Sequence, residues 1–233
     1  MSPVTTRFGA AVQLCRRSPL LLLALLLLLG TGCSKKPTGP PDAGGLANGV
    51  YTNTFFNFKM TLPTRWYSLT KKGLAAKEAW SEEVFRSQQG GQPQSPAATP
   101  PAAPERTSYN LFMVSQLQPD TTGTFNPSLS CVAERVAHLS QPITAADFLA
   151  RIKTILSESR SFTASFTGEP DVVALGGQNF SHLRANLTVG PMVITQEYYA
   201  LAANGYILAL VKSYQTQEQG AILEESLRSL RFL

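Results

Sequence analysis

Three two-residue turn motifs divide the second half of the chain into four strand-like runs. The pairs are Gly176-Gly177, Gly190-Pro191 and Asn204-Gly205. Asn-Gly is the strongest short-range indicator of a β-hairpin, because both residues tolerate the positive φ that a tight turn requires. Hairpins join antiparallel neighbours, whereas parallel strands need long crossover connections. The pattern therefore predicts an antiparallel sheet rather than repeated βαβ units.

Two further strands are expected upstream of these hairpins. Residues 57–62 alternate between polar and apolar side chains, as a half-buried strand does, and Pro63 ends the run. Residues 109–117 are apolar on both faces, which indicates cover on both sides. Together with the four runs of the hairpins, they predict a sheet of about six strands.

Helical periodicity appears in four segments. Residues 74–85 and the final segment around residues 222–230 repeat apolar side chains at helical spacing. Asn126-Pro127 offers an N-cap followed by proline at the first helical position, which predicts a helix from residue 127. A fourth helix is expected after Thr144, where Asp147 completes a capping box. The expected fold class is α+β, an antiparallel sheet with helices packed on both faces.

Two segments lack any apolar periodicity. Residues 33–48 and residues 87–106 are rich in proline and glycine. Such segments bury too little apolar surface to order themselves. We interpret residues 33–48 as a flexible tether and residues 87–106 as a disordered loop within a single domain that spans residues 49–233, because the stretch before the loop is too short for a domain of its own.

The N-terminus has the organisation of an export signal, which we assign to residues 1–32. Basic residues precede Leu20–Leu29, a run of ten strongly apolar residues. This length fits a signal-peptide core of roughly 7–15 residues and is too short to span a bilayer. Leu29-Gly30-Thr31-Gly32-Cys33 resembles the lipobox of bacterial lipoproteins, with Gly30 where leucine is usual.

That resemblance implies that Cys33 carries acyl chains such as palmitate and anchors the protein to a membrane on its non-cytoplasmic side. Ser34 follows where a retention signal for the inner membrane has aspartate, which implies the outer membrane, facing the periplasm, in a cell that has one. Several acyl chains anchor stably, because each buried CH₂ contributes about 0.8 kcal/mol. An ordinary secretory signal with an incidental cysteine and an uncleaved membrane anchor remain the alternatives.

Charge argues against a nucleic-acid partner. The chain has a formal net charge of +5, from 20 basic and 15 acidic residues. Arg7, Arg16, Arg17, Lys35 and Lys36 supply the whole excess, so the domain itself is formally neutral. Nucleic-acid binding depends on clustered basic residues that contact phosphates, and the sequence has no such run outside the N-terminus.

Two ends of the domain resemble PsbP-like domains. The first stretch comprises Gly49–Asn53, Phe56–Phe58 and Leu62–Trp66, with Thr64-Arg65 where that family has glycine, and the second comprises Gly205–Leu210 and Ser229–Phe232. The resemblance implies an antiparallel sheet with helices on both faces. PsbP-like proteins mostly bind or help to assemble other proteins, but a shared fold does not transfer function.

Candidate chemistry is sparse, since the chain has only two histidines. On the helix expected from residue 127, Cys131, Glu134 and His138 share the side opposite the apolar stripe. Cys131 and His138 would lie about 10 Å apart along the axis. Neither a shared metal nor a nucleophile pair fits that distance, so we interpret this side as a solvated polar face.

A second polar face follows the strand around residue 182. Phe180, His182, Arg184 and Asn186 alternate with apolar residues, so they share one face. His182, Arg184 and Asn186 form a possible recognition surface, on which the guanidinium would meet a carboxylate or phosphate. The alternative is an ordinary outer sheet face.

Known catalytic motifs are absent from the sequence. It contains neither GxxxxGK[ST] nor GxGxxG, and no GxSxG. We therefore expect a non-enzymatic, lipid-anchored envelope protein without cofactor or metal, which binds or helps to assemble another envelope protein. A carrier that holds a small solute or lipid between sheet and helices is the alternative, and an enzyme of unrecognised type is a third hypothesis.

Overall fold

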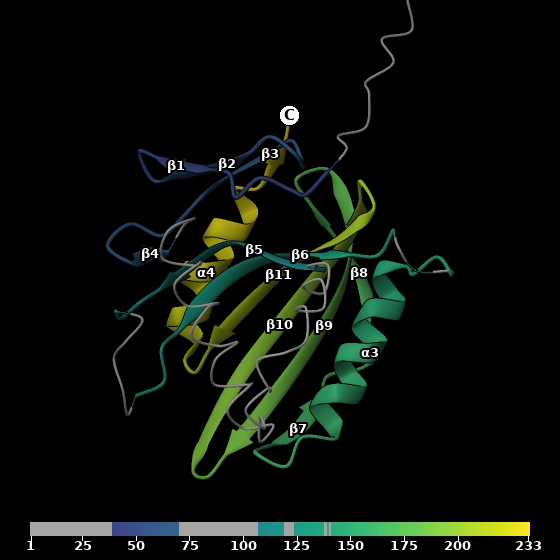
Figure 1. Cartoon of the computed structure of the whole chain (residues 1–233). Coiled ribbons are helices and arrows are strands. Elements are labelled where there is room, and N and C mark those ends of the chain that lie inside the picture. Colours follow the sequence, from purple (N-terminus) through teal and green to yellow (C-terminus); the bar gives the residue numbers. More distant parts are fainter. Residues whose placement is uncertain (1–38, 70–106, 119–123, 138, 140) are drawn as a thin grey trace, which may run out of the picture. The chain divides into compact units, whose positions relative to one another are not determined.

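The computed structural model describes residues 39–69, 107–118, 124–137, 139 and 141–233. All of them belong to one compact unit that begins at Pro37. Its largest feature is an eight-stranded sheet in which every pairing is antiparallel (Figure 1). In spatial order its strands are β4 (Tyr67–Leu69), β5 (Ser108–Ser115), β6 (Ser128–Arg135), β11 (Tyr206–Tyr214), β10 (Met192–Ala203), β9 (Gln178–Val189) and β7 (Thr163–Phe166), while β8 (Asp171–Leu175) also pairs with β9.

A smaller sheet of four strands joins the two ends of the described chain. Its order is β1 (Gly45–Ala47), β2 (Val50–Asn53), β3 (Phe58–Thr61) and β12 (Arg231–Phe232). Pairing of β12 with β3 brings the last residues beside the first strands, and the Leu233 amide donates to the Asn57 carbonyl at 2.8 Å. The described residues thus form two sheets, and the larger one has eight strands, which corrects the expectation of a sheet of about six.

The three predicted turns connect β8 to β9, β9 to β10, and β10 to β11. Asn204 and Gly205 both have positive φ, 53° and 82°. Because that turn has two residues, Ala203 pairs with Tyr206 and the register of the whole β10–β11 ladder follows. The prediction of four antiparallel strand runs between residues 171 and 214 is confirmed.

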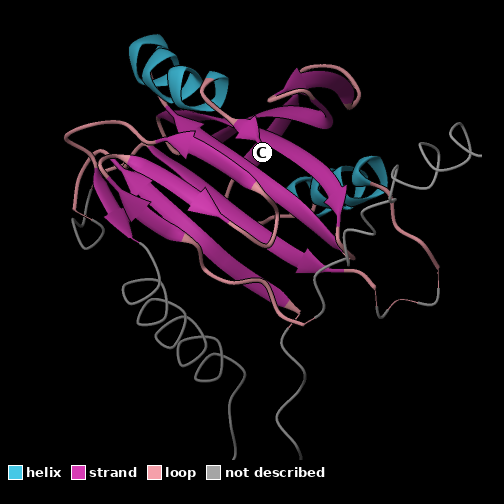
Figure 2. Cartoon of the chain, turned by 90° about the horizontal axis from the view of Figure 1, so that it is seen from above, coloured by secondary structure: helices cyan, strands magenta, loops and turns pink. Residues whose placement is uncertain are grey.

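Two helices are described, α3 (Ala145–Ser157) and α4 (Gln217–Arg228) (Figure 2). The expected capping box at the start of α3 is present: Thr144 Oγ1 accepts from the Asp147 amide and the Asp147 carboxylate accepts from the Thr144 amide. Thr216 and Gln219 form a second capping box at the start of α4. Both helices predicted after residue 143 are confirmed.

Each helix packs on a separate apolar cluster. Leu149 of α3 lies with Leu183, Ala200 and Ile207. Leu223 and Leu227 of α4 lie in a larger cluster whose members from β11 include Tyr206, Leu208, Leu210 and Tyr214. Side chains of β11 therefore alternate between the clusters: Ile207 belongs to the cluster under α3, and its neighbours Tyr206 and Leu208 belong to the cluster under α4.

The helix expected from residue 127 is wrong, because residues 128–135 form strand β6 between β5 and β11. Asn126 does not cap a helix. Its side chain accepts from the Leu117 amide and donates to the Leu117 carbonyl, which closes the connection between β5 and β6. Alternation decides burial here: Leu129, Cys131 and Ala133 are fully buried. Strand β11 is buried on both faces and hydrogen-bonds to a neighbouring strand along this edge. Residues 128–135 provide that strand, so the apolar residues that predict a helical stripe lie on β6 instead.

Several predictions fall outside the described residues. They are the signal peptide of residues 1–32, the lipid site at Cys33, the helix at residues 74–85, the loop at residues 87–106 and the position of His138. Among the described residues, no helix is long and apolar enough to cross a membrane.

Candidate functional site

The polar face predicted on β9 splits into three different environments. Phe180 is fully buried in the larger apolar cluster. The side chain of His182 is 16% exposed and lies against Tyr199, with ring centroids 4.6 Å apart in a stacked arrangement. Arg184 is exposed, and Asn186 accepts a hydrogen bond from Thr195 Oγ1 at 3.0 Å. The structure therefore buries His182 within a cluster of ionisable groups, while Arg184 pairs with Glu197 of that cluster across the β9–β10 ladder and keeps its side chain exposed.

That cluster is centred on Glu197 of β10 and Lys212 of β11, which face each other across the ladder. Both residues are buried, with 6% and 3% of their surface exposed. Lys212 Nζ lies 3.1 Å from Glu197 Oε2. Two opposite charges this far inside a protein stabilise it only when other polar groups satisfy their remaining atoms.

Two tyrosines complete the surroundings of the Glu197 carboxylate. Tyr199 donates its hydroxyl to Oε2 at 2.6 Å, and Tyr214 donates to Oε1. Burial opposes the charged form of Glu197. These hydrogen bonds, the contact with His182 and the charge of Lys212 outweigh that effect, so the pKa of Glu197 lies well below its ordinary value of 4.5. Burial and then the bond to this carboxylate raise the pKa of Tyr199 and of Tyr214.

Lys212 also connects the sheet to α4. Its Nζ donates to Glu224 Oε2 at 2.9 Å and lies 5.4 Å from the centre of the Tyr214 ring. Arg228 Nε stands 3.3 Å from the other oxygen of Glu224, on the exposed side of the helix. One buried ammonium group thus holds carboxylates from two elements.

His182 connects the same cluster to the edge strand β8. Its Nδ1 lies 2.8 Å from Asp171 Oδ1. Its Nε2 atom is buried and makes no hydrogen bond to a described residue, although Glu197 Oε2 is 3.6 Å away. Burial alone would lower the pKa of His182, but the two neighbouring carboxylates outweigh it and raise that pKa above 6.5. A protonated imidazole suits this position, because both of its nitrogens then face a carboxylate.

We refer to Asp171, His182, Glu197, Lys212 and Glu224, together with the two tyrosines, as the charged cluster. It contains an imidazole, carboxylates and hydroxyls, which are the groups that acid–base chemistry uses. Their mutual contacts, however, join β8, β9, β10, β11 and α4 to one another. Within the described part of the chain, no group of histidine, cysteine and acidic side chains has the arrangement of a metal site. The arrangement acts as an internal brace.

Cys131 and Glu134, expected on a solvated helix face, lie on β6 instead. Cys131 is fully buried between Phe112 and Leu210, its pairing partners in the sheet. Burial raises the pKa of its thiol far above the ordinary value, which leaves the group unreactive. The structure therefore makes Cys131 a core residue.

A separate open groove of about 700 Å³ lies between α4 and the turn that follows β3. Pro63, Arg65 and Trp66 line one side, and Ile222 and Glu225 of α4 line the other. Arg65 has a φ of 69°, a conformation that favours glycine. This is the turn where the PsbP-like pattern has glycine. None of the residues of the charged cluster lines this groove.

Sequence reasoning missed Glu197 and Lys212, yet the hairpins contain the information. A two-residue turn at Asn204-Gly205 places Glu197 opposite Lys212, and a two-residue turn at Gly190-Pro191 places His182 opposite Tyr199. Counting outward from both turns would have brought these four residues onto one face. Glu224 and Asp171 come from other elements and could not be placed in this way.

Comparisons with known proteins give similarity at the level of overall chain path. No model of a known protein family matches the chain, and no curated protein sequence matches it. One similar solved structure is cyanobacterial PsbP (CyanoP) from Synechocystis sp. PCC 6803, with 15% identity and a TM-score of 0.47 over 84% of this chain and 99% of that one. Another is LpqN, involved in cell envelope biogenesis of Mycobacterium tuberculosis, with 14% identity and a TM-score of 0.40 over 75% and 82% of the two chains.

Proposed function

We propose that this protein is a lipid-anchored, non-catalytic module of the cell envelope that binds or helps to assemble another envelope protein. The N-terminal sequence carries the first half of the proposal: a basic start, a ten-residue apolar run and Cys33 within a lipobox-like motif. The charged cluster supports the non-catalytic part of the proposal, because the Glu197 carboxylate is held by Lys212, Tyr199 and Tyr214, and these contacts brace the sheet.

Replacement of Cys33 tests the anchor. In cells that express Cys33→Ala, we expect the protein to lose its acyl chains and to move from the membrane fraction to the soluble exported fraction. Cys131→Ala is the matched control, because that thiol is buried and has no part in anchoring. A Cys33→Ala protein that stays processed and membrane-bound would rule out lipid anchoring.

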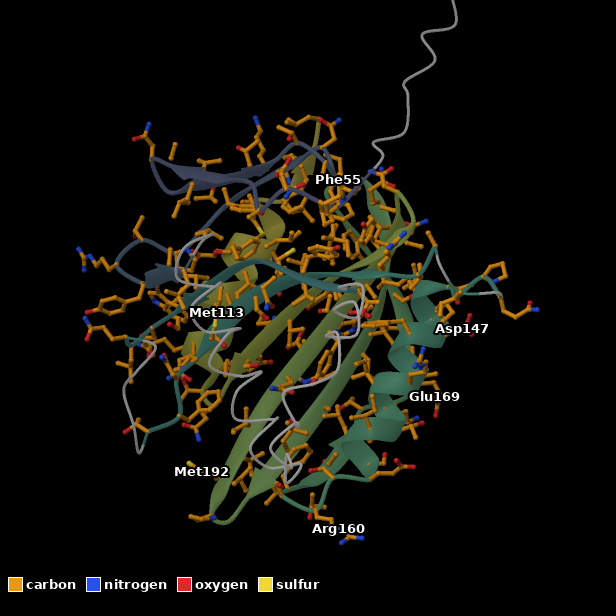
Figure 3. The ribbon with its side chains drawn as sticks, in the orientation of Figure 1. Phe55, Met113, Asp147, Arg160, Glu169 and Met192 are labelled. Carbon is orange, nitrogen blue, oxygen red and sulfur yellow. The ribbon has the colours of Figure 1, made fainter. Side chains whose placement is uncertain are left out.

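The partner is best sought from Arg184, the exposed member of the predicted recognition surface. A photo-crosslinking residue at position 184 should give a specific adduct with another envelope protein in intact cells. Arg160, also exposed but in the connection between α3 and β7, provides the control position (Figure 3). Equal adducts from positions 184 and 160, or none from position 184, would count against this surface.

The groove beside Trp66 favours one second candidate, a carrier for a small solute. Its volume falls in the range of roughly 300–1,000 Å³ that ligand sites occupy, and it combines apolar side chains with Arg65 and Glu225. Native mass spectrometry of gently purified protein should then show a retained small molecule, which Trp66→Ala would release. Purified protein without any bound mass would exclude this candidate.

A further inference from the structure

The end of the predicted tether is docked on the domain. Residues 39–47 lie among the described residues, and Asp42 is the centre of their contacts. Its Oδ1 accepts from the Gly44 amide at 2.7 Å, and its Oδ2 accepts from Thr54 Oγ1 at 2.6 Å. Its backbone carbonyl accepts from Asn53 Nδ2 at 2.9 Å. Residues 39–47, which we call the clasp, are thus held by side chains at the end of β2.

Contacts on both sides of Asp42 extend this docking. Pro41 is buried. The hydroxyl of Tyr206 donates to the Gly39 carbonyl at 3.2 Å, and the hydroxyl of Tyr51 donates to the Ala43 carbonyl at 3.0 Å. The clasp then continues into β1, which pairs with β2. A segment composed like a flexible linker is therefore ordered by its contacts with the domain.

Gly44 shows that this docking depends on the sequence of the clasp. Its φ is 63°, and a Cβ added there would lie 2.5 Å from the Thr52 carbonyl oxygen and 2.5 Å from the Tyr51 hydroxyl. No other residue fits without displacing the clasp from β2. The next residue, Gly45, has nothing within 4 Å of an added Cβ. Two adjacent glycines thus differ completely in what they tolerate.

Docking decides how far the domain can stand from its anchor. Six peptide steps separate Cys33 from Gly39. Even a fully extended chain spans at most about 3.3–3.6 Å per residue, so the docked clasp limits this distance to about 20 Å. With the clasp released, the free chain would run to Val50, and the limit would rise to about 60 Å.

We propose that the clasp is a built-in spacer that keeps the Gly39 end of the domain at the surface of the bilayer in which Cys33 is anchored. This inference rests on the proposed lipid anchor. The Gly39 end includes the Asn204 turn, since Asn204 Nδ2 donates to the Phe55 carbonyl and Tyr206 contacts Gly39. The β9–β10 hairpin lies at the other end of β10, away from Phe55 (Figure 3). The two ends of β10 are about 36 Å apart, at about 3.3 Å per residue over its eleven steps.

Energy transfer to the bilayer tests the spacer. The full lipidated chain is placed in phosphatidylethanolamine/phosphatidylglycerol vesicles that contain acceptor-labelled lipid, and a donor dye is attached at Leu233→Cys or at Val193→Cys. Both positions are exposed, at 62% and 51%, whereas Cys131 is buried and does not compete for the dye. We expect greater transfer from position 233, which lies beside β3, than from position 193 on the distal hairpin.

Gly44→Ala is the decisive variant and Gly45→Ala its matched control. Gly44→Ala should reduce transfer from position 233 and expose residues 39–48 to limited proteolysis, while Gly45→Ala leaves both readouts unchanged. Asp42→Ala serves as a second releasing variant if Gly44→Ala unfolds, as judged by circular dichroism. If the clasp of a variant is cleaved but energy transfer from position 233 is unchanged, the proposed role as a spacer is wrong. It is also wrong if the clasp resists cleavage in both releasing variants.

Failure of the anchor gives a different result. Wild-type chain that does not float with the vesicles contradicts lipid anchoring and, with it, the role of the clasp as a membrane spacer. Proteolysis of the same protein in solution still reports whether Gly44 and Asp42 hold the clasp.

Discussion

Two carboxylates, Asp42 and Glu197, each hold separate parts of this molecule together, but they do so in opposite environments. Asp42 is exposed and accepts from an amide, an amide side chain and a hydroxyl, all of them neutral. Glu197 is 6% exposed and faces the ammonium group of Lys212. The first docks a terminal segment on a finished domain, whereas the second lies inside the sheet that defines the domain.

The two carboxylates differ in whether water can replace the hydrogen bonds that they lose. When the clasp opens, solvent takes over the hydrogen bonds of Asp42, so release costs little and leaves the sheets intact. When a partner of Glu197 is removed, water cannot enter as readily and a buried charge stays uncompensated. We therefore expect graded, local effects at Asp42 and cooperative, global effects at Glu197.

The largest effect should follow from Lys212→Met. This change leaves Glu197 charged, buried and without its cation, and such an unpaired buried charge typically costs about 3–5 kcal/mol of folding free energy. Urea denaturation measures the loss. Lys153→Met is the control, because Lys153 pairs with the exposed carboxylate of Glu169 and such pairs contribute at most about 1 kcal/mol. The double variant Lys212→Met/Glu197→Gln should recover part of the loss, and equal losses in the two lysine variants would contradict a special role for the cluster.

A smaller effect should appear as a pH dependence of folding stability. The pKa of His182 is raised in the folded state. The histidine's contribution to folding stability is therefore complete below pH 6.5 and is lost as pH rises through the folded-state pKa. The pKa of Glu197 is lowered in the folded state. The contribution of this carboxylate to folding stability is therefore complete above pH 4.5 and is lost as pH falls through the folded-state pKa. Thermal unfolding measured over a series of pH values should therefore show the greatest stability between pH 4.5 and pH 6.5.

His182→Gln separates the two contributions. Glutamine keeps a polar side chain but does not titrate, so the decline in stability on the alkaline side should disappear while the decline on the acid side remains. Asp147→Asn is a suitable control, because this carboxylate belongs to the α3 capping box, far from the cluster in sequence. An alkaline decline that persists in His182→Gln would show that another group is responsible.

Asp42→Ala should act on the clasp alone. It removes the acceptors of the Gly44 amide and of Thr54, while Asn53 keeps its bond to the backbone carbonyl of residue 42. We expect the opening of residues 39–47 to become easier by about 1–2 kcal/mol, with little change in global unfolding. Hydrogen exchange at Gly44 and at β1 measures the opening. A matching drop in the stability of β10 and β11 would contradict the contrast with Glu197.

The sequence predicts best where local chemistry leaves one solution. The Thr144/Asp147 capping box marks the start of α3, and Asn204-Gly205 marks a hairpin, because each signal satisfies a local backbone requirement. The same turns contain the register that pairs Glu197 with Lys212. Four of the seven residues of the charged cluster, Glu197, Lys212, His182 and Tyr199, can therefore be paired by counting residues outward from the Asn204-Gly205 and Gly190-Pro191 turns.

The sequence misleads where distant contacts override local preference. Asn126-Pro127 is a good helix start, but β11 is buried on both faces and needs a neighbouring strand, which residues 128–135 provide. A helix over these residues places Cys131 opposite the apolar stripe, whereas strand β6 places it in the core, where free cysteines are often found. The clasp differs from its prediction for a similar reason. Its proline and glycine content predicts a tether, and its order comes from Tyr51, Asn53 and Thr54 of the domain.

The smallest predicted effect isolates one hydrogen bond of the clasp. Thr54→Val keeps the shape of the side chain but removes the hydroxyl that donates to Asp42 Oδ2 at 2.6 Å. Because this contact is exposed, its loss should ease opening by only about 0.5–1 kcal/mol, a roughly two- to fivefold faster cleavage of residues 39–48 by a protease in limiting amount. Thr52→Val, on β2 but without a side-chain contact to Asp42, is the control. Combined with Asp42→Ala, the Thr54 change should add nothing further, since its acceptor is already gone. An additive effect would mean that Thr54 holds the clasp by another route, and the exposed carboxylate would then no longer be the centre of the clasp.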